Sequence, residues 1–273
     1  MVDKQPLSPD QKATSGLAPA EIYDQLFVPT FFSRFTDLVL QASHVTKGQT
    51  VLDVGCGTGA LAVAASDRVL PRGKVSGLDA NEEMLEVARN KDIPIDWNFG
   101  TAEQLPFDDD TFDSVISQFA LMYVEDKPKA LQEMRRVLKP GGRLAVLVPD
   151  AIDHSPGFSV AAELLHRLFD EVVAEGMRSP FQSGNPEHLR EVCDAAGLHH
   201  ADIVTVNGAG RFDSPAAFMK VEGACAWSIG GLLDDQQLEL LYKEADQAFR
   251  PFQNEDGSIT INTPCLILQA SAG

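Results

Sequence analysis

The chain has 273 residues, of which 44% are hydrophobic, and it carries 40 acidic against 22 basic side chains for a formal net charge of −18. This length and apolar content suffice for one α/β domain with a full core, and they exclude a chain that is disordered throughout. A surface so acidic repels phosphate backbones, so we expect no nucleic-acid partner.

The four cysteines are scattered along the chain and form no C-x-x-C pair. This spacing predicts neither a zinc site nor a disulfide framework, so we expect no metal and a reducing, cytoplasmic environment. No run of residues has the length and apolar character of a membrane span, so stable membrane insertion is not expected. The polar residues 1–16 predict a flexible tail, and residues 17–273 are expected to form a single domain.

Helical and extended patterns alternate over the first part of the chain. Apolar residues recur at helical spacing over 21–43, where Pro29 is expected to separate two helices. The patterns that follow predict, in chain order, a strand at 50–54, a helix at 60–70, a strand at 74–79, a helix at 82–90, strands at 95–100 and 112–118, a helix at 126–138 and a strand at 143–149. Such alternation favours a parallel sheet with helices on both faces, in which ligands bind beyond the carboxyl ends of the strands.

The remainder of the chain is less regular. It predicts helices at 158–176, 185–197 and 214–250 and strands at 201–207 and 260–270. We interpret the two strands as late members of the same sheet. Helical insertions at about 150–185 and 212–258 are then expected to cover the ligand site.

A glycine-rich loop with the sequence DVGCGTG joins the first strand of this series to its helix. Gly55, Gly57 and Gly59 allow a tight turn and let a ligand approach the main chain, and the helix that follows offers unpaired N–H groups. Gly55, Gly57 and Ala60 also satisfy the dinucleotide pattern G-x-G-x-x-G/A. An NAD-dependent oxidoreductase therefore stays open as an alternative.

Two carboxylates flank this loop in the sequence. Asp79 ends the next strand, where a carboxylate can accept hydrogen bonds from both ribose hydroxyls of either ligand. Asp53 directly precedes the glycines, where a carboxylate suits a cationic ligand and is unfavourable beside a pyrophosphate. The other interpretation of Asp53 is a helix cap or a turn former.

Four motifs follow one another in the order and at the spacing of a known family. They are VLDVGCGTG (51–59), GLDANEEMLEVA (77–88), GTAEQLPFDDDTFDSVIS (100–117) and LKPGGRLAV (138–146). On these motifs the chain resembles the class I S-adenosylmethionine (SAM)-dependent methyltransferases, and within them the small-molecule branch that includes the quinone-biosynthesis enzymes. The resemblance implies a Rossmann-like, doubly wound, mostly parallel seven-stranded α/β sheet. It also implies methyl transfer from SAM to a small-molecule acceptor by in-line displacement, with S-adenosylhomocysteine as the product.

The resemblance implies roles for the residues of the first motif. Asp53 would serve the amino group of the methionine part of SAM through a water molecule. Gly55, Cys56 and Gly57 would offer their backbone to the same part of the cofactor, with Gly59 completing the loop.

The second and third motifs imply the contacts with the nucleoside. Asp79 would hold the ribose, Ala80 and Met84 would lie against the adenine face, and Ala102 would bind adenine through its main chain. Thr101 stands where the family usually has Asp, so a contact between this residue and the adenine amino group is left open.

Three further residues are expected near the reaction. Gln118 would lie near the sulfonium, and Tyr23 would either close over the cofactor or simply pack onto the sheet. An acceptor with a hydroxyl or an acidic carbon needs a base to take its proton. His154, just after the fifth strand, is the best-placed candidate, although a lone histidine is more often structural.

The apolar side chains of the two insertions favour a lipophilic or aromatic acceptor beneath a cap. Ordinary packing of the cap would require the same residue types. Besides the NAD-dependent enzyme, the remaining alternative is a SAM-binding protein that transfers no methyl group.

Overall fold

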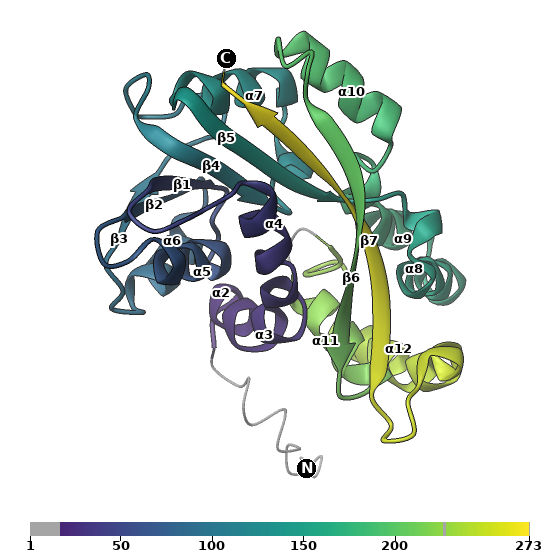
Figure 1. Cartoon of the computed structure of the whole chain (residues 1–273). Coiled ribbons are helices and arrows are strands. Elements are labelled where there is room, and N and C mark those ends of the chain that lie inside the picture. The colour runs from purple at the N-terminus through teal and green to yellow at the C-terminus, as the bar shows by residue number, and fades with distance from the viewer. Residues whose placement is uncertain (1–16, 226–227, 273) are drawn as a thin grey trace.

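A computed structural model of the chain describes residues 17–225 and 228–272. The predicted flexible tail, residues 1–16, lies outside the described residues. A seven-stranded sheet in the order β3-β2-β1-β4-β5-β7-β6 forms the centre of the molecule (Figure 1). The strands are β1 (Thr50–Val54), β2 (Lys74–Asp79), β3 (Ile95–Phe99), β4 (Phe112–Gln118), β5 (Leu138–Pro149), β6 (Asp202–Phe212) and β7 (Ile259–Ser271).

The first five strands run parallel, and β7 pairs antiparallel with both β5 and β6. The predicted doubly wound, mostly parallel seven-stranded sheet is thereby confirmed. The order of the strands reverses between β1 and β4, because the chain builds β2 and β3 on one side of β1 and β4 and β5 on the other. In open sheets of this kind, the crevice at the reversal is where ligands bind.

Helices cover both faces of the sheet. They are α4 (Thr36–Ala42), α5 (Ala60–Val69), α6 (Glu82–Arg89), α7 (Lys127–Arg136) and α10 (Pro186–Ala195). Alternate residues of β5 divide between two apolar clusters: Ala145 joins the cluster of α4 and α5, and Leu144 joins the cluster of α7 and α10. This alternation follows from the two-residue repeat of a strand and buries both faces of the sheet.

The predicted pair of helices before the sheet is a chain of shorter segments. These are α2 (Pro19–Ile22), the π-helical turn η1 (Tyr23–Phe27), α3 (Val28–Thr30), the 3₁₀ turn η2 (Phe32–Arg34) and α4. The prediction that Pro29 separates two helices is wrong in detail, because Pro29 lies within α3 and the backbone leaves helical geometry at Phe31. Proline has no N–H for the regular helical hydrogen bond, and the wide π turn just before it accommodates that loss.

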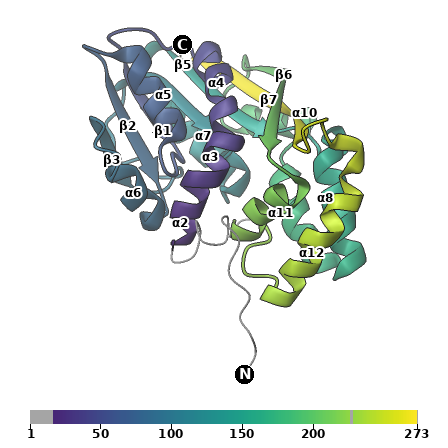
Figure 2. The same ribbon diagram turned by 90° about the horizontal axis from the view of Figure 1, so that it is seen from below.

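The two predicted insertions contain helices. They are α8 (Pro156–Leu168), α9 (Glu171–Arg178), α11 (Pro215–Ala224) and α12 (Asp235–Ala248). Seen from below, α8, α11 and α12 lie together beside the extended ends of β6 and β7, and α5 and α6 lie on the other side of the molecule (Figure 2). Within the described ranges, no helix combines the length and the apolar character needed to cross a bilayer.

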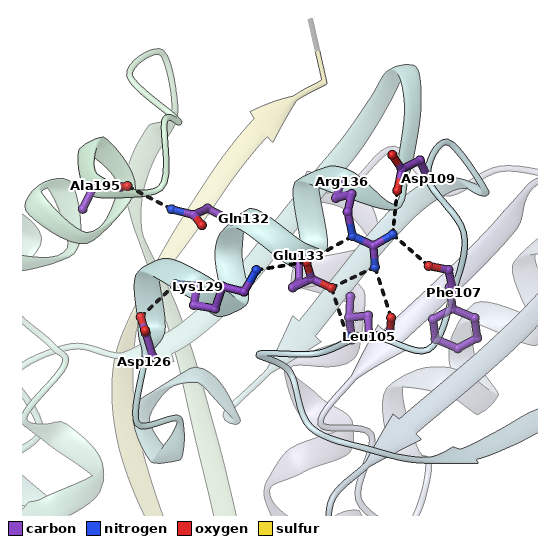
Figure 3. Close-up of polar contacts among 9 residues, drawn as sticks. All are labelled: Leu105, Phe107, Asp109, Asp126, Lys129, Gln132, Glu133, Arg136 and Ala195. Carbon is purple, nitrogen blue, oxygen red and sulfur yellow. Dashed lines mark hydrogen bonds and ion pairs between the residues drawn. The ribbon is translucent and has the colours of Figure 1, made fainter.

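Hydrogen bonds from α7 hold the loop between β3 and β4, which carries the third motif (Figure 3). The Arg136 guanidinium donates to the backbone oxygens of Leu105 and Phe107 at 3.1 and 2.8 Å. It also forms an ion pair with Glu133, whose carboxylate accepts from the Leu105 N–H. This network, built around the buried Glu133, fixes the loop to α7.

Replacement of Glu133 by Gln is expected to lower the free energy of unfolding by about 2–3 kcal/mol at neutral pH. The hydrogen bonds with Arg136 and Leu105 lower the pKa of Glu133 from its ordinary 4.5 to about 2. Its stabilisation is therefore full above pH 4.5 and is lost as the pH falls toward 2. Urea unfolding at pH 7 and pH 3 tests this, with exposed Glu86→Gln on α6 as the control. A difference between wild type and Glu133→Gln that is as large at pH 3 as at pH 7 would contradict it.

Candidate functional site

A cavity of about 480 Å³, here called the glycine-loop cavity, opens at the carboxyl ends of β1, β2 and β4. The predicted cofactor residues that line it are Tyr23, Gly55, Gly57, Asp79, Ala80, Met84, Thr101, Ala102 and Gln118. The predicted residues Asp53, Cys56 and Gly59 lie outside this lining and belong to the strand end and loop that bound it. The cavity occupies the reversal of strand order, where a ligand site is expected.

The glycine loop has a backbone that side chains would obstruct. Gly55 has φ +72° and Gly59 has φ +93°, which is the left-handed region. A Cβ at Gly55 would overlap the Cβ of Ala120, the residue two positions after β4. Glycine at this position therefore lets the loop close onto the end of β4.

Most of the N–H groups of this loop are already bonded within the protein. Gly55 and Cys56 both donate to the Leu78 carbonyl, and Gly59 donates to the Cys56 carbonyl. Gly57 donates to the Asp79 carboxylate at 2.7 Å. The loop therefore presents acceptor groups to a ligand more readily than donors.

Asp53 is 1% exposed, and its Oδ2 has no hydrogen-bond partner. Burial and the negative charge of Asp79 raise the pKa of Asp53 from 3.8 to about 8, against a hydrogen bond from Ala62 that lowers it. A buried carboxyl of this kind is stabilised as an anion when a cation comes close. The hydrogen bond from Ala62, in the first turn of α5, is the helix-capping contact that the alternative interpretation expects, although Gly59 occupies the N-cap position itself. That contact leaves Oδ2 without a partner.

Asp79 is bonded at both carboxylate oxygens. Its Oδ2 accepts from Gly57, and its Oδ1 accepts from Asn81 at 2.8 Å. Burial still raises the pKa of Asp79 above 3.8. Asp53 and Asp79 thus form an acidic pair on either side of the loop, at the edge of the cavity.

The lining of the glycine-loop cavity is acidic. Asp79, Glu103 and Glu125 contribute carboxylates, and no lysine, arginine or histidine of the described chain lines the cavity. Such surroundings favour a ligand with a positive charge and oppose a pyrophosphate.

The far end of the cavity is formed by the loops after β2 and β3. Ala80 and Met84 line it from one side, and Thr101 and Ala102 line it from the other. The Thr101 main chain pairs with Gln104 in a single β-bridge, so this loop is closed on itself. The structure thereby brings together the residues predicted to contact adenine.

Tyr23 and Gln118 also line the cavity. Tyr23 comes within contact range of the loop, because a Cβ at Gly57 would lie 3.9 Å from its ring and hydroxyl. Gln118 donates from Nε2 to the Phe32 carbonyl, and its buried Oε1 has no partner. The N-terminal segment that carries Tyr23 is tied down by an ion pair of 2.6 Å between Asp24 and Lys91.

A second, smaller cavity of about 50 Å³, here called the aromatic cavity, adjoins the first. Phe32, Phe119 and Tyr123 line both cavities. Phe119 has φ +53°, a backbone conformation that costs a bulky residue about 1–3 kcal/mol and that is typical of functional sites. The remaining lining comes from distant segments: Phe27, Phe31, Met122, Pro149, Phe158, Met177, Pro180, Phe181, Glu222, Ser228 and Thr263.

The sequence interpretation missed Glu222, a buried carboxyl of the aromatic cavity. It lies on α11 between Phe218, Met219 and Cys225, all of which are buried. The helical spacing of these residues puts a single carboxylate on an apolar helix face, and this signal was available in the sequence.

His154 lies elsewhere. It forms the end of η4 (Ile152–His154), where its Nδ1 is 2.9 Å from Asp150 Oδ2. Its side chain is 62% exposed, and it lines neither cavity. The structure therefore does not bring it together with the other predicted site residues.

Comparison with known proteins finds curated relatives that are similar in sequence and solved structures that are similar in fold. The chain is 48% identical over 122 residues to the ubiquinone/menaquinone biosynthesis C-methyltransferase UbiE of Escherichia coli, a match that covers 42% of this chain and 47% of that protein. The match thus spans about half the length of the curated relative.

Solved structures extend the likeness of the fold over most of the chain. The YcgJ protein from Bacillus subtilis is 22% identical with a TM-score of 0.56, covering 86% of this chain and 97% of that one. The [4+2]-cyclase SpnF is also 22% identical, with a TM-score of 0.51 and coverage of 88% and 86%. At these identities, the likeness concerns the fold alone.

A family model completes the assignment. The model of the ubiE/COQ5 methyltransferase family matches residues 27–172, more than half of the chain and the whole span of the four motifs. The resemblance predicted from those motifs is confirmed, and the chain belongs to the ubiE/COQ5 methyltransferase family.

Proposed function

We propose that this chain binds SAM in the glycine-loop cavity and transfers its methyl group to a small-molecule acceptor. The observation that carries the proposal is Asp53, a buried carboxyl with an unpaired oxygen beside a loop whose N–H groups are mostly bonded. SAM has an ammonium group at its methionine end and a sulfonium, and both of these positive charges are complementary to the carboxyl.

The same geometry argues against the NAD-dependent alternative. A pyrophosphate is bound by free N–H groups at a glycine loop and by nearby cations. Here the N–H groups of Gly55, Cys56 and Gly57 are bonded within the protein, and the lining is acidic. Asp79 supports a nucleoside of either kind and does not distinguish the two ligands.

The residues present fit SAM along its whole length. Asp53 and the glycine loop would hold the methionine part, Asp79 the ribose, and Ala80, Met84 and Ala102 the adenine. Thr101, which lines the cavity beside Ala102, would offer its hydroxyl at the edge of the adenine. When bound, SAM supplies a methyl group made electrophilic by the attached sulfonium.

The chain's own residues then orient the reactants and exclude water. Gln118 has an unpaired Oε1 at the end of β4, where it would lie near the sulfonium of the bound cofactor. Phe32, Phe119 and Tyr123 line both cavities and would present apolar surface to an acceptor. Holding two reactants in line in a dry site accounts for much of the catalysis that such a transfer needs.

Isothermal titration with SAM, S-adenosylhomocysteine and NAD tests the cofactor. We expect SAM and its product to bind with dissociation constants in the micromolar range and NAD to give no heat of binding. Tight binding of NAD without binding of SAM would overturn the proposal.

A SAM-binding protein without methyl transfer remains the second candidate, because a [4+2]-cyclase shares this fold. Incubation with SAM and a panel of phenols, amines and quinone precursors distinguishes the two, with S-adenosylhomocysteine as the readout. Quinone precursors belong in the panel because of the name of the curated relatives. Production of S-adenosylhomocysteine with any acceptor would exclude the second candidate.

We further propose that the insertions at about 150–185 and 212–258 cap a lipophilic or aromatic acceptor. The aromatic cavity supports this assignment, since α8, α9 and α11 contribute Phe158, Met177 and Glu222 to its lining. The four cysteines, all unpaired, support a reducing, cytoplasmic environment. The charge of −18 supports the absence of a nucleic-acid partner.

A further inference from the structure

Glu222 stands out among the groups of the aromatic cavity. It is 3% exposed, and its Oε1 has no hydrogen-bond partner. A buried carboxyl with an unsatisfied oxygen opposes folding, and an apolar residue of similar size would pack there without that cost. A group that the fold retains at such a cost is a candidate for ligand binding.

The surroundings of Glu222 contain no compensating cation. The described residues that line the aromatic cavity include no lysine, arginine or histidine. The ionisable groups that interact with Glu222 are Tyr123 of η3 (Leu121–Tyr123) and Cys225 just after α11. Ser228 hydrogen-bonds to the carboxyl and also lies 4.0 Å from the Met177 sulfur of α9.

The position of the cavity connects Glu222 with the reaction. The aromatic cavity meets the glycine-loop cavity at Phe32, Phe119 and Tyr123. A hydroxyl group at this boundary would therefore lie between the bound cofactor and α11. Glu222 also lies outside the matched residues 27–172, so no family role is carried over to it.

We propose that Glu222 binds the hydroxyl group of an aromatic acceptor at the boundary of the two cavities, where the small aromatic cavity meets the larger one, and takes its proton during methyl transfer. This inference rests on the proposed function. The phenolic O–H proton passes to Oε1 of Glu222, and the electron pair left on the phenolate oxygen forms the bond between that oxygen and the methyl carbon. The bond between that carbon and sulfur breaks, and its electron pair stays on sulfur. The carboxyl then returns the proton to solvent.

The protonation of Glu222 matches this role. Burial raises the pKa of Glu222 from 4.5 to about 7, against the hydrogen bond from Ser228 that lowers it. Tyr123 and Cys225, whose own pKa values are raised by burial and by Glu222, stay neutral at this pH. Glu222 therefore gains its charge between pH 6 and 8, and as an anion it accepts a hydrogen bond more strongly.

Binding of phenol and toluene to the S-adenosylhomocysteine-saturated protein tests the proposal. The two probes have the same shape, so the ratio of their dissociation constants isolates the hydroxyl contact. We expect Glu222→Gln and Glu222→Leu to reduce the preference for phenol at pH 8 by about tenfold or more. In the wild type, the preference should rise from pH 6 to pH 8, and in Glu222→Gln it should stay constant. Ligand-observed NMR measures both.

Two controls separate this role from a structural one. Exposed Glu239→Gln on α12 should leave the phenol preference unchanged. Ser228→Ala should keep the preference but move its pH midpoint upward, because it removes the hydrogen bond that lowers the pKa of Glu222. General damage to α11 would weaken phenol and toluene equally and leave their ratio intact.

The outcomes also separate this inference from the proposed function. If S-adenosylhomocysteine does not bind to the wild type, the proposed function itself is wrong. If it binds to wild type and Glu222→Gln alike while the phenol preference is the same in both, the role of Glu222 is overturned and the cofactor assignment stands.

Discussion

The Gly55→Ala variant is expected to bind S-adenosylhomocysteine at least about 100-fold more weakly and to lose about 2–4 kcal/mol in free energy of unfolding. Two costs add. The backbone at Gly55 has φ +72°, which strains any residue with a Cβ. The added methyl would also overlap the Cβ of Ala120. Alanine has no alternative rotamer, so this Cβ can move only if the backbone after β4 moves. The loop must move away from β4, and the cavity between them changes shape.

Gly141→Ala is a matched control for this variant. Gly141 has φ +76°, nearly the same backbone conformation, but a Cβ there would meet no atom within 4 Å. It should therefore show only the backbone strain, about 1–2 kcal/mol, with unchanged affinity. Urea unfolding and isothermal titration measure both quantities. Equal losses of stability in the two variants, with unchanged affinity in Gly55→Ala, would show that the close approach to Ala120 has no effect.

Strands of the sheet are predicted well where the signal is local. The β-rich runs at 50–54, 74–79 and 112–118 coincide with β1, β2 and β4. β6 and β7 reach further than predicted, to Phe212 and from Ile259, because their outer residues pair with each other across a long separation in sequence. The π turn η1 was also not predicted, since a helical pattern of apolar residues does not distinguish one kind of helical hydrogen bond from another.

The residues of the candidate site likewise fall into two groups: those with a local sequence signal and those that only the fold brings together. The glycine loop, Asp79 and the third motif could be located because each is a short continuous signal next to a strand end. The aromatic cavity could not, because its lining joins residues as distant in sequence as Phe27 and Thr263. Glu222 becomes a candidate only when this three-dimensional neighbourhood is known, although its place on an apolar helix face was visible beforehand.

Asp53→Asn is expected to have opposite effects on stability and on binding. The folded pKa of about 8 lies above the ordinary 3.8, so as the pH rises the unfolded chain loses this proton first. The ligand-free wild type therefore loses stability between pH 4 and 8, by up to about 1.4 kcal/mol per pH unit from this group. Asparagine stays neutral, so the variant should become progressively more stable than the wild type over that range and equal to it below pH 4.

Binding should become weaker, because the ammonium group of the ligand no longer has the Asp53 carboxylate as its partner. We expect Asp53→Asn to bind S-adenosylhomocysteine about 10- to 100-fold more weakly at pH 8. In the wild type, affinity should rise with pH up to about 8, and a proton should be released on binding at pH 7. Titration in buffers of different ionisation enthalpy measures that proton.

Asp79→Asn distinguishes this effect from simple damage at the loop. The Asp79 carboxylate accepts hydrogen bonds from Gly57 and Asn81, and an asparagine amide nitrogen cannot accept, so its replacement leaves one N–H without its acceptor. This loss opposes the gain expected from removing a carboxyl whose pKa burial raises, and the affinity should fall. The larger gain of stability is therefore expected for Asp53, whose Oδ2 has no partner within the protein and whose pKa rises to about 8. An Asp53→Asn variant that is less stable than the wild type at every pH would contradict the prediction. It would mean that the Asp53 carboxylate stabilises the ligand-free fold, and that its unpaired oxygen does not serve to bind a cation.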